Sequence, residues 1–80
     1  MAVTVVFIGK LADLAGGDER EVPAPLTWSG LAGVLGADLA EAAADERTKI
    51  AVNGEVLADK AALNAGDGDE VALLPPVSGG

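Results

Sequence analysis

The chain has 80 residues, of which 50% are hydrophobic, and its formal net charge is −8. This length corresponds to one domain, and so high an apolar fraction excludes intrinsic disorder. The negative charge argues against nucleic acid or an anionic membrane as a partner, because both select clusters of Lys and Arg. An acidic surface suits a basic protein partner, or it simply keeps the chain soluble.

Several reactive side chains are missing. The sequence contains no Cys, no His and no Tyr. This excludes a disulfide framework, a thiolate metal site and most side chains that serve as nucleophile or general base near neutral pH. No apolar run approaches the ~18 residues of a membrane span, and the basic start and cleavage site of a signal peptide are missing. We therefore expect a cytoplasmic protein.

The first predicted element is a strand over residues 3–8, which are rich in β-branched side chains. The period of two places Val3, Val5 and Phe7 toward the core. Val6 and Ile8 lie on the other face, which should be wet, and they make it unusually apolar. This face is either a second buried layer or an interface, and so short a chain can hardly build two layers.

Two short elements are expected next. A helical turn over residues 10–15, which carries Leu14, should end at Gly16, because glycine suits the left-handed position after a helix. Residues 18–22 then predict a polar second strand with one inward apolar residue, Val22. We expect this strand to pair with the first.

One main helix is expected before the third strand. Thr27 should be its N-cap, and Gly36 should end it. Asp38 should cap a second, Ala-rich segment. Two glycines inside the main helix each cost about 1 kcal/mol relative to Ala, so packing must hold the helix. Its apolar face, by helical spacing, consists of Trp28, Leu31, Ala32 and Leu35.

The clearest local signal is Asn53-Gly54, which separates the apolar runs 49–52 and 55–57. Asn-Gly between two such runs predicts a hairpin with a type I′ turn. Asp59 should then cap a short turn.

The last strand is expected over about residues 70–74, after a loop rich in Gly and Asp. Asp67 and Asp69 in this loop resemble part of a Ca²⁺ loop. A Ca²⁺ loop of the EF-hand type is followed by a helix, whereas a strand follows here. We therefore interpret the segment as a turn.

These elements predict an α+β fold, with a mixed four- to five-stranded sheet and one main helix packed on one face. A right-handed crossover from the second strand through the helix to the third satisfies the handedness rule, and the arrangement is a β-grasp. We expect the β-grasp domain over residues 1–74 and an extended tail over 75–80. The core beneath the main helix is predicted to contain Val3, Val5, Phe7, Leu14, Val22, Leu31, Leu35, Ile50, Val52, Leu63 and Val71.

The tail reads Pro-Pro-Val-Ser-Gly-Gly. Pro75 and Pro76 stop the strand and favour a stiff, extended arm of roughly 3 Å per residue. Gly79 and Gly80 have no Cβ, so they can pass through a slot that no side chain would pass. A frayed terminus is the alternative. If the chain takes part in covalent chemistry, the α-carboxylate of Gly80 is the best-placed group.

The tail resembles the C-terminal end of the ubiquitin-like sulfur-carrier family (MoaD/ThiS), most closely its molybdopterin synthase small subunits. The resemblance continues in three upstream segments, in the family's order. Two departures are visible: Leu73-Leu74 stands where aromatic residues are frequent, and the main helix is rich in glycine. Neither departure lies in the Gly79-Gly80 end of the tail. The three upstream segments are Phe7 to Gly16, Ile50 to Gly54 and Asp67 to Val71.

The resemblance implies that an ATP-dependent enzyme adenylates the Gly80 carboxylate, which then becomes a thiocarboxylate, with Gly79 leaving room for the chemistry. It implies that the tail enters the large synthase subunit and gives sulfur to cyclic pyranopterin monophosphate. The chain would bind no cofactor and carry no catalytic side chain, although it would be part of a sulfurtransferase. The expected partner-binding residues are Val6, Ile8, Leu74, Pro75, Pro76, Val77 and Ser78.

Two alternatives stay open. The chain could carry sulfur for thiamine, tRNA or cysteine synthesis, although Pro-Pro-Val-Ser directly before Gly-Gly favours the molybdopterin branch. It could also be a β-grasp interaction module whose tail is inert.

Overall fold

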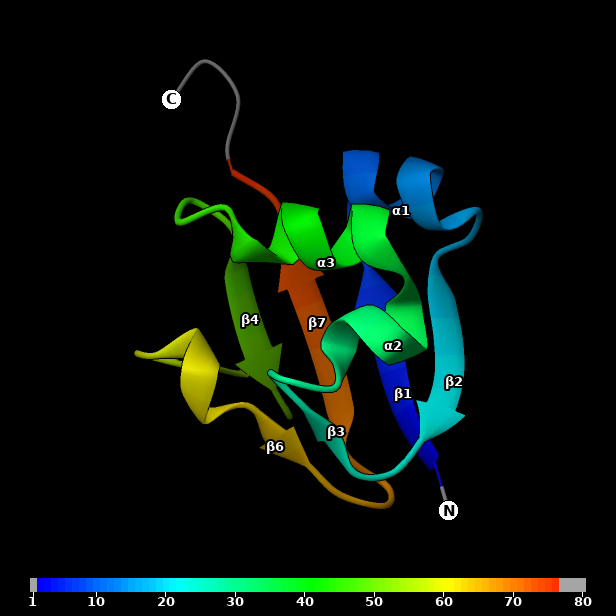
Figure 1. The fold of residues 1–80 in the computed structure, drawn as a ribbon, viewed down its shortest axis with the longest axis vertical. Coiled ribbons are helices and arrows are strands. Elements are labelled where there is room, and N and C mark those ends of the chain that lie inside the picture. Colours follow the sequence, from blue (N-terminus) through cyan, green and yellow to red (C-terminus); the bar gives the residue numbers. More distant parts are fainter. Residues whose placement is uncertain (1, 77–80) are drawn as a thin grey trace.

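A mixed sheet of five strands, in the order β2-β1-β7-β4-β5, lies behind the helices in Figure 1. The computed structural model describes residues 2–76. β1 and β7 are parallel, and the other neighbouring strands are antiparallel. The helices lie on one face of this sheet, which confirms the predicted ubiquitin-like β-grasp. The strands of the sheet are β1 (Ala2–Phe7), β2 (Glu19–Pro23), β4 (Lys49–Val52), β5 (Glu55–Val56) and β7 (Glu70–Leu74).

β1 shows the predicted alternation of burial along a strand. Val3, Val5 and Phe7 are buried, and the residues between them are half-buried. β1 has a neighbouring strand on each side, so its backbone groups are paired along both edges. The inward set therefore follows from the period of two, as the sequence predicts.

The hairpin between β4 and β5 turns at Asn53 and Gly54, whose φ angles are 52° and 85°. Positive φ at both positions is the type I′ geometry, so that prediction is confirmed. The cap at Asp59 is confirmed as well. Its Oδ1 accepts the backbone N–H of Ala61 at 3.0 Å, at the start of the short 3₁₀ helix η1 (Lys60–Ala62).

The main helix is present as α2 (Leu31–Leu35), which begins later than expected, and the predicted Ala-rich segment after it is α3 (Ala37–Ala44). Gly36 separates them with a φ of 97°, a value that favours glycine and breaks the helical path. Gly36 itself is the N-cap of α3, so Asp38 lies inside the first turn and is not the cap. Trp28, expected on the helix face, precedes α2.

A second, small sheet has no counterpart among the predicted elements. β3 (Leu26–Thr27) pairs antiparallel with β6 (Asn64–Ala65). Thr27 also accepts the N–H of Gly30 at its Oγ1, at 3.1 Å, just before α2. The predicted capping role of Thr27 is therefore present in part, although Gly30 is the N-cap residue of α2. A strand of two residues is too short to show a period in the sequence.

Helix α1 (Lys10–Ala15) lies at the end of the sheet, beyond β1 (Figure 1). It ends as predicted at Gly16, whose φ of 79° is left-handed. Leu11 is buried, but Leu14 is 48% exposed. The prediction that Leu14 belongs to the core is wrong, because this short helix sits at the rim of the core and only Leu11 enters it.

The core is aliphatic apart from Phe7. Val52 is half-buried and packs against the core, whereas it was predicted inside it. The other predicted core residues are buried: Val3, Val5, Phe7, Val22, Leu31, Leu35, Ile50, Leu63 and Val71. Further members of the core cluster are Leu11, Leu26, Leu39, Ala43, Ala65 and Leu73.

Candidate functional site

The tail leaves the sheet at the end of β7. β7 stops at Leu74, and the half-buried Pro75 and Pro76 follow outside the strand, as expected of residues that donate nothing to a ladder. Gly9 faces the ring of Pro75, since a Cβ built on Gly9 would lie 3.6 Å from Pro75 Cγ. The base of the tail therefore lies beside the exit of β1. The other predicted tail residues, Val77, Ser78, Gly79 and Gly80, lie outside the described residues.

An apolar strip crosses the outer face of the sheet, which is the face turned away from α2 and α3. Val6 lies directly opposite Ala72, Ala72 opposite Ala51, and Ala51 opposite Val56. Glu19 of β2 lies opposite Val6 and ends the row on the other side. Neighbouring strands of a sheet lie roughly 4.7–4.9 Å apart, so the strip is continuous over four strands.

Ile8 and Leu74 widen this strip toward the tail. Phe7 and Leu73 are partners in the register of β1 and β7, and Ile8 and Leu74 each follow one residue later. We call the resulting surface the apolar face patch, which consists of Val6, Ile8, Ala51, Val56, Ala72 and Leu74.

The apolar face patch is open to solvent at its ends. Ile8 is 44% exposed and Val56 is 53% exposed, whereas Ala51 is buried and Val6, Ala72 and Leu74 are half-buried. The helices α2 and α3 cover the opposite face of the sheet (Figure 1), so the described residues form no second buried layer over the patch. An exposed apolar patch of this kind is typical of an interface.

The structure thus brings Val6, Ile8 and Leu74 onto one face, while their role in binding stays a prediction. Sequence reasoning missed Ala51, Ala72 and Val56. The Asn-Gly turn alone would have placed Val56 opposite Ala51, but the pairing of β4 with β7 joins segments far apart in the sequence.

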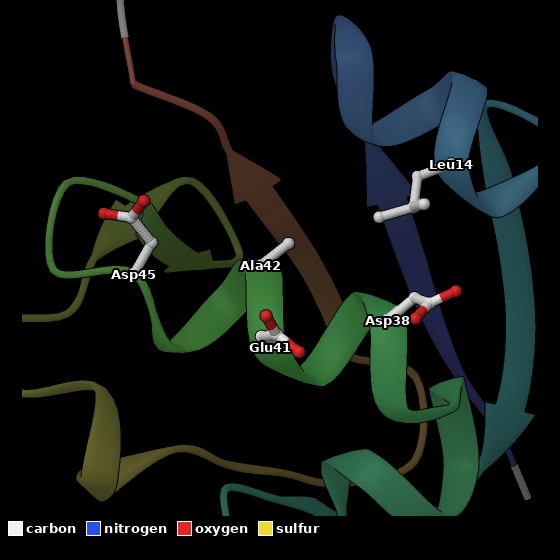
Figure 2. Close-up of a pocket in the computed structure, with 5 residues that line it drawn as sticks. All are labelled: Leu14, Asp38, Glu41, Ala42 and Asp45. Carbon is white, nitrogen blue, oxygen red and sulfur yellow. The ribbon is translucent and has the colours of Figure 1, made fainter.

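The hollow between α1 and α3 is acidic (Figure 2). It encloses about 350 Å³. The side chain of Leu14 reaches into it from α1, and Ala42 faces it from α3. Asp45 lies at the edge of the hollow, where Arg47 donates a hydrogen bond from Nη2 to its Oδ2 at 3.0 Å. The side-chain and backbone hydrogen bonds from Arg47 lower the pKa of Asp45 from 3.8 to about 2. Its polar lining consists of carboxylates, Asp38, Glu41 and Asp45, with no nucleophile among them.

Trp28 lies at a second hollow, of about 320 Å³, and packs there against Lys60. The ammonium group of Lys60 is 5.7 Å from the centre of the indole ring. The same group donates to the carbonyl oxygens of Ala43 and Asp45, at 2.6 and 2.7 Å. Trp28 therefore has a structural contact on its ring, which agrees with its interpretation as a packing residue.

The loop before β7 is a turn, as predicted. Asp69 Oδ2 accepts the N–H of Gly66 at 2.8 Å, and Asp69 Oδ1 accepts a hydrogen bond from the side-chain amide of Asn53 at 3.0 Å. Over residues 2–76 no group of three or more potential metal-ligating side chains gathers. In the same range no helix has the length and apolar character to cross a bilayer.

Comparison with known proteins agrees with this geometry. Residues 5–80 match the ThiS family. The fold is similar to SAMP1 from Haloferax volcanii, with a TM-score of 0.72 and 27% identity over 100% of both chains. It is also similar to molybdopterin converting factor subunit 1 from Pyrococcus furiosus, with a TM-score of 0.67 and 27% identity over 96% of this chain and 99% of that one.

A third similar structure is a complex of subunits 1 and 2 of the molybdopterin-converting factor from Helicobacter pylori. Its TM-score is 0.66, with 25% identity over 100% of both chains. No curated protein sequence matches the chain. The family match spans nearly the whole chain and agrees with the β-grasp fold, so the chain belongs to the ThiS family of ubiquitin-like sulfur carriers.

Proposed function

We propose that this chain is the sulfur carrier of molybdenum cofactor biosynthesis and forms the small subunit of molybdopterin synthase. Its Gly80 carboxylate is first adenylated and then thiocarboxylated, and the thiocarboxylate donates sulfur to cyclic pyranopterin monophosphate. The observation that carries the proposal is the family match, which includes Gly79 and Gly80. The similarity to two molybdopterin-converting factor subunits supports this branch of the family.

The chemistry is consistent with a carrier that has no catalytic side chain. A carboxylate is a poor electrophile until it carries a leaving group. The Gly80 carboxylate attacks the α-phosphate of ATP on the activating enzyme, pyrophosphate leaves, and a sulfur donor then displaces AMP from the acyl carbon. The chain itself holds no cofactor in this scheme, since ATP belongs to the activating enzyme.

The partner is the large subunit of the synthase, and the apolar face patch is the surface that it covers. The Helicobacter pylori structure is a complex of subunits 1 and 2 of that factor, which supports a partner of this kind. Pro75 and Pro76 then direct residues 77–80 into the partner. The cytoplasmic location stays a prediction.

A second candidate is a protein modifier, in which the activated Gly80 is joined to an amine of a target protein. The structural similarity to SAMP1, a small archaeal modifier protein, favours it. Carriers for thiamine, tRNA or cysteine sulfur share the first chemical steps. An interaction module with an inert tail shares none of them.

Intact-mass spectrometry tests the proposal. The protein is incubated with ATP, the activating enzyme and a sulfur donor, and fragment ions then locate the change. We expect one oxygen-for-sulfur exchange at Gly80, followed by sulfur transfer to cyclic pyranopterin monophosphate once the large subunit is added. If the mass is unchanged, the chain is an interaction module with an inert tail. A thiocarboxylate that never reaches the pterin points to another sulfur pathway, and a covalent conjugate to another protein points to a modifier.

A further inference from the structure

The charged side chains on the outer face are divided by sign, with acids toward β2 and a lysine on β4. Val22 of β2 is buried and Arg20 is half-buried, so these two residues point inward. Side chains alternate along a strand, and Glu19 and Glu21 therefore point to the outer face. Glu21 lies opposite Thr4, and Thr4 lies opposite Glu70 of β7. The side of the outer face toward β2 is therefore acidic, with Glu19 near its tail end and Glu21 and Glu70 farther from the tail. We call Glu19, Glu21 and Glu70 the acidic corner.

Lys49 occupies the other corner. It begins β4 and lies directly opposite Leu74, the last residue of β7 before the tail. Its neighbour Ile50 is buried, so the alternation of β4 directs Lys49 to the outer face. Among the outward-facing strand residues Lys49 is the basic one, and it stands where the tail leaves the sheet, across the apolar face patch from the acidic corner.

None of these four charges forms an ion pair with another residue of the range 2–76. Lys49 and the three residues of the acidic corner are all exposed. The ion pair found among residues 2–76 joins Arg47 to Asp45 and involves none of these four residues. The outer face thus has an unbalanced acidic end and an unbalanced basic end.

The apolar face patch alone cannot fix how a partner sits. Its side chains are Val, Ile, Ala and Leu, which offer no directional contact. A partner turned by half a turn about the sheet normal would still cover the same side chains, but the tail would then point away from its site. Charge complementarity can fix the orientation of the partner and disfavour the reversed one.

Resting on the proposed function, we infer that the acidic corner and Lys49 set the orientation in which the large synthase subunit binds this chain. The large subunit presents basic side chains to Glu19, Glu21 and Glu70, and a carboxylate to Lys49. In this orientation the tail enters the large subunit, and in the reversed one like charges meet. A second copy of this chain is a poor occupant, because both copies carry a net charge of −8.

Charge-reversal variants test the inference. Glu19→Lys and Lys49→Glu each change one corner. Glu41→Lys, on the exposed surface of α3, is the matched control for Glu19→Lys, because it changes the net charge equally but lies on the other side of the molecule. The dissociation constant with the purified large subunit is measured by calorimetry at low and high salt, together with the rate of sulfur transfer from the thiocarboxylated protein.

We expect Glu19→Lys and Lys49→Glu each to weaken binding by about tenfold at low salt, with the difference shrinking at high salt. Glu41→Lys should change binding less than about twofold. The inference is overturned if Glu41→Lys weakens binding as much as Glu19→Lys, because net charge and not orientation would then be the cause. It is also overturned if neither corner variant changes binding.

Mass spectrometry of Gly80 separates this failure from failure of the proposed function. If the wild-type protein is thiocarboxylated and binds the large subunit while both corner variants behave like it, only the orientation inference falls. If the wild-type protein is not thiocarboxylated or does not bind, the proposed function and the inference fall together. A wild-type protein that binds itself in place of the large subunit also overturns the inference.

Discussion

Gly9 faces Pro75 at the junction of β1 and the tail, with 3.6 Å between Pro75 Cγ and the position that a Cβ of Gly9 would take. That distance is an ordinary van der Waals contact, so space does not require glycine here. The backbone does, because φ is 60° and ψ is −130° at Gly9. This combination is essentially restricted to glycine.

Gly9→Ala should therefore lower the free energy of unfolding by about 1–3 kcal/mol, through backbone strain alone. Urea unfolding followed by far-UV circular dichroism measures the change. Gly33→Ala is the control, since Gly33 lies inside α2 with no atom within 4 Å of an added Cβ. It should stabilise the protein by up to about 1 kcal/mol. If Gly9→Ala and Gly33→Ala lower the free energy of unfolding equally, the argument from backbone strain at Gly9 is wrong.

Lys60 ties η1 to the end of α3, and its removal should destabilise the protein. Its ammonium group satisfies the carbonyl oxygens of Ala43 and Asp45, where the helix leaves acceptors unpaired. Lys60→Met keeps a long unbranched side chain but removes its charge. It should lower the free energy of unfolding by about 1–3 kcal/mol. Lys49→Met, on an exposed strand position, should cost less than about 0.5 kcal/mol. Equal costs in urea unfolding would show that the carbonyl contacts contribute little.

The hydrogen bonds to Asp69 predict a dependence of stability on pH. The side-chain amide of Asn53, and after it the N–H of Gly66, lower the pKa of Asp69 below 3.8. A carboxylate with a depressed folded-state pKa contributes stability above its unfolded pKa, and this is lost as pH falls through the folded one. Asp69→Asn should thus be destabilising at neutral pH, and its difference from wild type should shrink below about pH 4.

Unfolding curves collected from neutral pH down to pH ~2 check this expectation for Asp69. Glu41→Gln is the control, because the Glu41 side chain accepts no hydrogen bond from residues 2–76. A difference between Asp69→Asn and wild type that stays constant over the whole range would contradict the linkage.

Two exposed aliphatic side chains of similar size lie on different faces and can be compared directly. Ile8, 44% exposed, belongs to the apolar face patch, and Leu14, 48% exposed, lies at the acidic hollow. Ile8→Lys should leave the fold intact and weaken binding to the large subunit by at least about tenfold, as expected for a charge placed in a desolvated interface. Leu14→Lys should leave binding unchanged. Equal affinities for both variants in calorimetry would place the interface elsewhere.

Local signals in the sequence were sufficient for much of the fold. The alternation of β1, the Asn53-Gly54 turn and the cap at Asp59 all involve residues close in the chain, where propensity and turn chemistry decide. Gly36 also had a clear signal as a helix end, and it ends α2 as predicted, but it serves in addition as the N-cap of α3, the role that was expected of Asp38.

Features that depend on packing between distant segments were not predictable. Leu14 has the spacing of a core residue, and only the position of α1 at the sheet end leaves it exposed. The pairing of Leu26 with Ala65 brings together two-residue strands with no local signature. Likewise, Ala72 joins the apolar face patch only through the register of β7 with β1 and β4.

Both the length of the tail and the absence of a side chain at Gly79 should matter for sulfur transfer. One residue added after Gly80 moves the acyl carbon by roughly 3.5 Å. Misplacement on the order of 1 Å can cost 10²-fold in rate, so the extended protein should be nearly inactive in sulfur transfer. Gly79→Val should fail as well, because a β-branched side chain fills the slot while the carboxylate remains. Pro76→Ala should be milder, since it loosens the arm without blocking it.

Single-turnover sulfur transfer with the large subunit, alongside intact mass after activation, measures these tail variants separately. Circular dichroism should show the same fold for all of them, because the changed positions follow Leu74, where the last strand of the sheet ends. We expect the order wild type, Pro76→Ala, then Gly79→Val and the extended protein close to zero. If the extended protein transfers sulfur as fast as wild type, the reaction does not depend on where the Gly80 carboxylate is placed, and the tail is then not the reacting group.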